Sequence, residues 1–330
     1  MQELNLDEKR VLSEVLNTSD PWRVAGEVRI PFPRFVNAVK ALEKKKLIKT
    51  ARGKIALTAK GKKLVREFRL VARSAARRRI ARARNRFIAL ARKRPTSISL
   101  YDQGYMTPES VFTRVEIISS LGDADGKRIA ILGDDDLLSI ALCLATQPLE
   151  VTVFEIDQRL VEYILDLADR NSLPINAYCH DLRNPLLSRF KGKFDVFVSD
   201  PSETIDGLKM FLGRGLFLLK SEAGKAGYFG LTAIEASYSK WAKTELWLLK
   251  NYSIAITHIL PSTAYYYNWP DLLTQTAGFD LLCLKKEPKL NWFNSSLIRL
   301  ETVDGFKPKG MGRITGPIFY DDESCGILRE

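Results

Sequence analysis

The chain has 330 residues, of which 45% are hydrophobic and 27% charged, a balance typical of a soluble protein with room for an α/β core and a second, smaller domain. No stretch of eighteen apolar residues occurs, and the acidic start MQELNLDEKR lacks the basic and then apolar pattern of a signal peptide. We therefore expect a cytoplasmic protein without a membrane segment. Two histidines and four scattered cysteines argue against a metal centre or a disulfide framework, so we expect no metal.

The net charge of +12 hides two halves of opposite sign. Residues 1–96 hold 27 Lys and Arg against 8 Asp and Glu, a net of +19, whereas residues 97–330 hold 24 against 31, a net of −7. An acidic pocket attracts cations and disfavours polyanions. The charge of the longer half therefore favours a positively charged substrate.

Residues 1–60 predict a small helical domain. Apolar residues at helical spacing predict helices over 7–16 and 32–47, and two short β-like runs around Gly53 predict a hairpin before a further helix from Thr58. This order, with the segment LTAKGKKLV, resembles a winged-helix domain. Such modules bind DNA or serve as dimerisation and packing units.

Residues 61–96 predict a basic helical linker. The segment 60–94 contains fifteen basic residues and one acid, Glu67, with many alanines and leucines that favour a helix, and Pro95 ends it. Two interpretations stay open: a basic helix that binds a nucleic-acid backbone, or a solvated linker whose apolar stripe packs on a neighbour.

Residues 97–330 predict a Rossmann-like, doubly wound parallel sheet, similar to class I methyltransferases. Short apolar runs alternate with amphipathic stretches: strands are expected at 127–132, 150–156, 175–181, 194–200, 226–231 and 254–260, and helices at 137–147, 158–171, 204–219 and 237–252. Ligands of such sheets bind beyond the carboxyl ends of the strands. The residues that directly follow each strand are therefore the candidates for a site.

Acidic residues follow the first four of these strands. The first strand leads into Gly133, Asp134, Asp135 and Asp136, where one carboxylate can cap the next helix and the other two are expected to face the ligand crevice. They would attract an ammonium group and repel a phosphate. The set therefore disfavours NAD and nucleoside triphosphates.

The other strand ends suggest an adenosine site. Glu155 is the better candidate for the ribose hydroxyls, with Asp157 beside it, and Asp181 lies where an adenine amino group is usually bound. The fourth strand ends in Asp200-Pro201-Ser202-Glu203-Thr204, which adds Asp200 and Glu203 as candidates for binding a cationic substrate.

The segments YDQGYMTPES, GDDDLLSIAL, HDLRNPL, DPSETIDGLKMFLGRG and GYFGLTAIEAS resemble the branched-chain polyamine synthases of thermophilic archaea and bacteria, from about Tyr101 to Tyr320. The resemblance implies an aminopropyltransferase of the N4-bis(aminopropyl)spermidine synthase type. Such an enzyme uses decarboxylated S-adenosylmethionine as cosubstrate, releases 5'-methylthioadenosine, and modifies the internal N4 amine of spermidine or a related linear polyamine. The resemblance also predicts that the chain forms a homodimer.

The resemblance also implies roles for individual residues. Asp135 matches the catalytic carboxylate, while Asp102 and Glu235 match acidic positions that hold the polyamine. The family's Asp-Pro-Pro-Glu-Thr is here interrupted by Ser202, and the basic helix replaces a cysteine-containing insert found in some members. We therefore infer no metal or cluster.

The chemistry expected of these carboxylates agrees with this resemblance. Loss of the methionine carboxylate makes the donor's tail cationic, and a carboxylate-lined loop suits such a tail; Asp135 can orient the acceptor amine and help to remove its proton. Aromatic residues are expected to form cation–π contacts with the polycation, Tyr228 first, with Trp269 among the others.

Two other functions are weighed. One is an S-adenosylmethionine-dependent N-methyltransferase acting on nucleic acid, favoured by the likeness of Asp200-Pro201 to the Asp-Pro-Pro motif of that class and by the basic helix. The other is a DNA-binding regulator that senses a metabolite. Both require the acidic face to stay away from phosphate.

Overall fold

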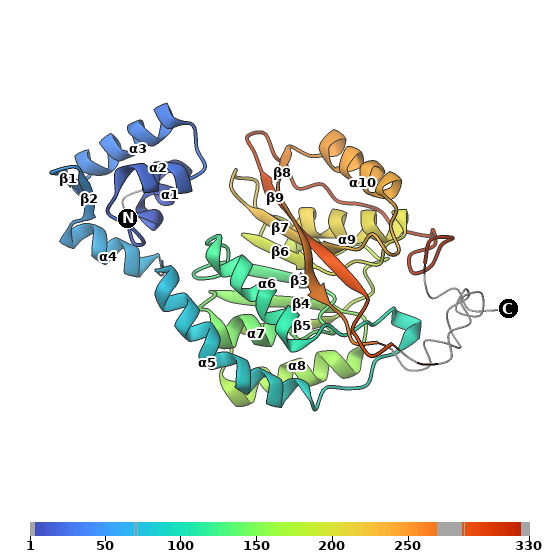
Figure 1. The fold of residues 1–330 in the computed structure, drawn as a ribbon. Coiled ribbons are helices and arrows are strands. Elements are labelled where there is room, and N and C mark those ends of the chain that lie inside the picture. Colours follow the sequence, from blue (N-terminus) through green and yellow to red (C-terminus); the bar gives the residue numbers. More distant parts are fainter. Residues whose placement is uncertain (1–3, 69, 71, 269–285, 287, 325–330) are drawn as a thin grey trace.

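A computed structural model describes residues 4–68, 70, 72–268, 286 and 288–324 (Figure 1). The cation–π candidate Trp269 lies outside these residues, as do Cys283 and the end of the chain from Cys325. No helix in the described ranges combines the length and apolar character that a membrane span requires.

Residues 4–67, here called the N-terminal unit, form four helices and a hairpin around their own apolar core, which includes Val11, Leu42 and Leu47. The elements are α1 (Leu6–Glu14), α2 (Pro21–Glu27), α3 (Phe32–Lys44), β1 (Ile48–Ala51), β2 (Lys54–Leu57) and α4 (Ala59–Glu67). The predicted helices and hairpin are confirmed within a few residues. Helix α2 was not predicted, although Asp20 caps it and proline occupies its first turn.

Helix α5 (Arg73–Ala91) connects this unit to the larger part of the chain. Its buried stripe, which includes Ile80 and Phe87, packs on α6 (Pro108–Ser120) and α7 (Leu138–Ala145). The packing interpretation of the basic helix is therefore confirmed for one of its faces.

A seven-stranded sheet forms the core of residues 97–324, in the order β5-β4-β3-β6-β7-β9-β8. Its strands are β3 (Arg128–Leu132), β4 (Glu150–Glu155), β5 (Ile175–Cys179), β6 (Val196–Ser199), β7 (Ala226–Leu231), β8 (Ile254–Tyr265) and β9 (Asn294–Thr302). The five strands from β5 to β7 pair in parallel, as predicted. The unpredicted β9 pairs antiparallel with both β7 and β8, so the sheet is mostly rather than wholly parallel.

Helices cover both faces of the sheet (Figure 1). Helices α6, α7 and α8 (Gln158–Asn171) share one apolar cluster with the sheet, while α9 (Ile205–Leu218) and α10 (Tyr238–Asn251) share the other. Short 3-10 turns lie at Ser99–Tyr101 and Ser188–Phe190. Because the helices pack on the two faces of the sheet, a ligand site is expected at the carboxyl ends of its parallel strands.

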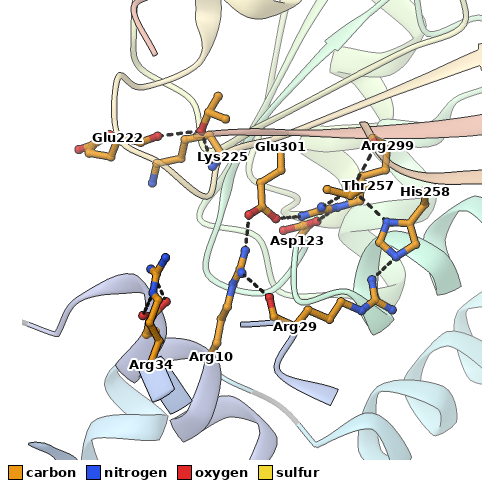
Figure 2. Close-up of polar contacts among 12 residues, drawn as sticks. Arg10, Arg29, Arg34, Asp123, Glu222, Lys225, Thr257, His258, Arg299 and Glu301 are labelled. Atoms are coloured by element: carbon orange, nitrogen blue, oxygen red, sulfur yellow. Dashed lines mark hydrogen bonds and ion pairs between the residues drawn. The ribbon is translucent and has the colours of Figure 1, made fainter. Parts of the chain in front are cut away.

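The N-terminal unit contacts the sheet edge through a few side chains, here called the seam (Figure 2). Arg10 forms an ion pair with Glu301, and Arg29 contacts the imidazole of His258. Leu6 lies so close to Gly224 that a β-carbon there would approach it to 2.6 Å. The seam is mainly polar, unlike the apolar packing of α5.

Candidate active site

A cavity lies at the carboxyl ends of the central strands and is lined by five carboxylates. These are Asp102, Asp135, Glu155, Asp181 and Asp200. Apolar side chains complete its walls, among them Phe154, Phe211 and Phe319. Of the described residues that line this acidic cavity, none is lysine or arginine. It combines an apolar wall for a ring system with several anionic contacts for a cation.

The loop after β3 presents only one of its three aspartates to the cavity. Gly133 has a φ of 74°, which turns the chain sharply after the strand. The Asp134 carboxylate is buried and accepts from the backbone N–H of Ser139, and Asp136 accepts from that of Met106 at 2.6 Å. Asp135 and Gly133 line the cavity, whereas Asp134 and Asp136 do not. The expected ligand contacts of these two residues stay a prediction, which their burial on backbone donors outside the lining does not support.

The environment of Asp135 favours its protonated form. Burial and then the neighbouring carboxylates Asp136 and Glu155 raise its pKa well above the ordinary value, against a lowering by Arg94. Arg94 follows α5, donates to the Asp135 carbonyl at 3.3 Å and stacks on the ring of Tyr105. A carboxylate with a raised pKa is a stronger base, which suits the acceptance of a proton from an amine.

Glu155 ends β4 with its carboxylate against the loop. Both of its oxygens accept backbone N–H groups, from Asp134 at 2.8 Å and from Asp157 at 2.9 Å, and it still lines the cavity. Asp157 instead caps α8, binds Arg159 and accepts from Gln103, so it lies outside the cavity lining. Asp181 lines the cavity while paired with Arg183 at 2.8 Å.

Two further acids, Glu203 and Glu235, interact electrostatically with Asp102 of the cavity lining. The pKa of Asp102 is raised by burial, by Glu235 and by Asp200; that of Glu203 is raised by burial and by the same two acids, with Asp102 adding to it. Asp102 is solvent-accessible, but protein atoms surround it on most sides, and its backbone has a φ of 54°, which non-glycine residues rarely adopt. Each of these acids therefore makes ionisation of the others less favourable.

Asp200 is held from two sides. Arg114 of α6 donates to its Oδ1 at 2.7 Å, and the Tyr266 hydroxyl donates to its Oδ2. The approach requires glycine at position 230, because a β-carbon there would lie 1.8 Å from Asp200 Oδ1. Burial, and then Asp200, raise the pKa of Tyr266 well above its usual value, which keeps the phenol protonated as a donor.

The prediction that Tyr228 binds the polyamine is wrong. Its side chain is fully buried in β7, and its hydroxyl donates to Asp123 at 2.5 Å beside Arg299. Asp123 precedes β3, so this contact lies at the opposite end of the strands from the acidic cavity; Figure 2 shows Asp123 and Arg299 on the seam side. The position of Tyr228 in a predicted strand did not show toward which end of the sheet its hydroxyl group points.

Several cavity residues were not predicted. They include Tyr101, Gln103, His180, Met210, Phe211, Ile318 and Phe319. Ile318 and Phe319 belong to a C-terminal segment fastened beside the cavity, where the hydroxyls of Ser202 and Thr204 donate to the carbonyls of Ile318 and Pro317. Proximity in the sequence to a predicted acid was the available signal for Tyr101, Gln103 and His180. The others lie in segments that only the fold brings to the cavity, and they gave no such signal.

Known proteins match this chain over most of its length. A model described as the branched-chain polyamine synthase A C-terminal domain matches residues 82–325. N(4)-bis(aminopropyl)spermidine synthase from Thermococcus kodakarensis is 34% identical over 327 residues, covering 96% of this chain and 93% of that protein. The protein of the same name from Thermus thermophilus is 37% identical, covering 90% and 87%.

The chain belongs to the branched-chain polyamine synthase family. A solved structure agrees: the branched-chain polyamine synthase from Thermus thermophilus, in complex with N4-aminopropylspermidine and 5'-methylthioadenosine, is 34% identical. It superposes with a TM-score of 0.70, over 97% of this chain and 93% of that one. The α/β fold of this branched-chain polyamine synthase family member is thus shared with a relative that binds a polyamine and a nucleoside together.

Proposed function

We propose that this chain transfers aminopropyl groups from decarboxylated S-adenosylmethionine to the internal N4 amine of spermidine and releases 5'-methylthioadenosine. The observation that carries the proposal is the acidic cavity, with five lining carboxylates and, among the described lining residues, no lysine or arginine. Intact S-adenosylmethionine would bring its own carboxylate into this field, whereas the decarboxylated donor brings only positive charge.

We divide the acids of the site into a donor set and an acceptor set. We assign Gly133, Glu155 and Asp181 to the donor, with Glu155 near the ribose and Asp181 near the adenine. The acceptor's outer ammonium groups would be bound by Asp102, Asp200, Glu203 and Glu235. Asp135 lines the same cavity and would contact the reacting amine.

The reaction needs a neutral amine, but spermidine is mostly protonated in neutral water. The ionised form of Asp135 takes the N4 proton, for which its raised pKa makes it a stronger base, and the freed lone pair attacks the methylene carbon beside the sulfonium. A C–N bond forms as the C–S bond breaks, and the bonding pair leaves with sulfur as neutral 5'-methylthioadenosine. In-line positioning of the two substrates supplies most of the acceleration.

A direct assay tests this function. The full chain is incubated with spermidine and either decarboxylated or intact S-adenosylmethionine, and products are identified by mass spectrometry. We expect aminopropyl adducts at N4 with the first donor only. Methyl transfer to RNA or DNA from the second donor would instead support the methyltransferase, and operator binding without turnover would support the metabolite-sensing regulator.

The domain division is also a proposal: residues 1–60 form a winged-helix-like domain, 61–96 a basic linker and 97–330 the catalytic domain. The order of three helices, a hairpin and α4 supports the first, and the separate apolar core of residues 4–65 supports its independence. We also propose a homodimer, which light scattering of the purified chain would test.

A nucleic-acid surface is a second candidate function, favoured by the outer face of α5. Two arginines of this helix bind the catalytic part, since Arg79 pairs with Asp125 and Arg84 with Glu109. Arg77, Arg78 and Arg82 are exposed, with no ion pair recorded to any described residue. Such cations bind phosphate backbones by releasing counterions.

Salt dependence tests this surface. We expect binding of a DNA or RNA duplex whose logarithmic affinity falls with logarithmic salt at a slope of about −2 to −3 for three phosphate contacts. The R77Q/R78Q/R82Q variant should lose most of that slope, whereas K191Q/K193Q/K243Q, which removes three other exposed cations, should keep it. Equal slopes in both variants would contradict the surface.

A further inference from the structure

Arg114 is a buried cation directly behind the acidic cavity. Its side chain is 2% exposed, although it projects from α6, and its guanidinium contacts Asp200, whose own side chain is 22% exposed. Burial alone would lower the pKa of Arg114, but Asp200, Tyr266 and Asp136 outweigh that effect and raise it. The arginine therefore remains charged without touching the cavity.

The contacts fix the Asp200 carboxylate in one orientation. Arg114 holds Oδ1 and Tyr266 holds Oδ2, while Tyr266 in turn contacts the Ser295 hydroxyl at 2.9 Å. Each carboxylate oxygen accepts about two hydrogen bonds, so each retains acceptor capacity. Because Asp200 lines the cavity, this remaining capacity is available to a ligand there.

The electrostatic setting gives the pair a second effect. Asp200 contributes to the raised pKa values of Asp102, Asp135, Asp136 and Glu203, so it lies within reach of the charge of all four. Without a cation nearby, that crowd of acids would favour protonation of some members. Arg114 offsets one negative charge from the protein side and leaves the cavity side anionic.

We propose that Arg114 and Tyr266 are positioning residues for the acceptor: they hold the Asp200 carboxylate oriented so that its free lone pairs bind an ammonium group of the polyamine. The donor nucleoside, on the Glu155 side, does not depend on them. The inference rests on the proposed function for its choice of ligand, but its test does not require turnover.

Equilibrium binding distinguishes a role of Arg114 and Tyr266 in acceptor binding from a purely structural role. Calorimetry with spermidine and with 5'-methylthioadenosine would be applied to the wild type and to R114M, R114K, Y266F and D200N. Y228F is the matched control, since it also removes a buried tyrosine hydroxyl from an Asp–Arg pair. Melting temperatures would confirm that each variant is folded.

We expect spermidine affinity to fall about 10-fold or more in R114M and D200N and about 3- to 10-fold in Y266F. R114K keeps the positive charge but lacks the planar guanidinium with its several N–H donors, so its spermidine affinity should lie between those of R114M and the wild type. Binding of 5'-methylthioadenosine should change less than 2-fold, and Y228F should resemble the wild type. In a turnover assay the same variants should raise the KM for spermidine more than they lower kcat.

The proposal is overturned if folded R114M and Y266F bind spermidine as the wild type does, or if both ligands weaken equally. It is also overturned if the wild type binds no spermidine. Wild-type binding without aminopropyl transfer would refute the proposed function while the positioning role is still decided by the variants.

Discussion

Two buried clusters of this protein contain the same three residue types, and one of them opens onto the acidic cavity. The cavity triad is Asp200, Arg114 and Tyr266, with Arg114 2.7 Å from the carboxylate. The seam triad is Asp123, Arg299 and Tyr228, with Arg299 2.9 Å from the carboxylate. In both, a tyrosine hydroxyl and a guanidinium donate to an aspartate.

Their surroundings differ. The seam triad adds one acid, Glu301, which is matched by Arg299 itself and by Arg10 of the N-terminal unit (Figure 2). The cavity triad adds Asp102, Asp136 and Glu203, whose pKa values are all raised. Paired charges indicate a structural role, whereas a surplus of one sign beside a cavity indicates a site that awaits the opposite charge.

The largest expected effect breaks the cavity chemistry without touching either triad. Asp135→Asn should lower kcat by about 10³-fold, because general-base catalysis is worth roughly 10² to 10⁴. The change is nearly isosteric in a loop, so the melting temperature should stay within a few degrees. Single-turnover assays would measure it, and a variant with wild-type rate would remove Asp135 from the mechanism.

The next effect concerns the seam triad and is one of stability. Arg299→Met leaves Asp123 buried without its cation and leaves Glu301 with Arg10 alone, which should cost about 3–5 kcal/mol in the free energy of unfolding. Urea denaturation would measure this cost. Arg170→Met, which removes an exposed pair with Asp166, should cost less than about 1 kcal/mol. Turnover per folded Arg299→Met molecule should be normal; a selective loss of kcat would make the seam part of the site.

A smaller effect tests the surplus of acid directly. Burial first, and then Asp200, raise the pKa of Asp136 to about 7. A carboxyl whose folded pKa is raised destabilises the fold as pH rises from its ordinary value of about 4 towards 7, because only the unfolded chain ionises easily there. Asp136→Asn should therefore raise the melting temperature at pH 8, by several degrees, and have little effect at pH 4.

Two results would count against that account of Asp136. One is an equal gain in melting temperature at both pH values, which would indicate better packing rather than relief of charge. The other is a loss at pH 8, which would mean that the bond from the Met106 amide needs a carboxylate.

The sequence predicted the parallel strands and their helices because their apolar periods are local. It did not predict β9, whose place between β7 and β8 depends on pairing with residues far along the chain. The same limit applies to the site. The GDDD loop was found from its position after β3, but which aspartate faces the cavity depends on backbone donors such as Met106, and the place of Tyr228 depends on Asp123.

The smallest expected effect lies in the seam and depends on pH. Burial, then Arg29 and Arg299, lower the pKa of His258 against the opposing effect of Asp123 and Glu301. Neutral His258 can accept from Arg29, so the contact is complete above about pH 6.5 and is lost as pH falls towards the lowered value, where two cations would face each other. Hydrogen exchange of residues 4–67 should accelerate between pH 7.5 and 5.5 after correction for intrinsic rates. His258→Gln should remove this pH dependence of hydrogen exchange and keep normal turnover. If the variant shows the same pH dependence as the wild type, a group other than His258 causes it.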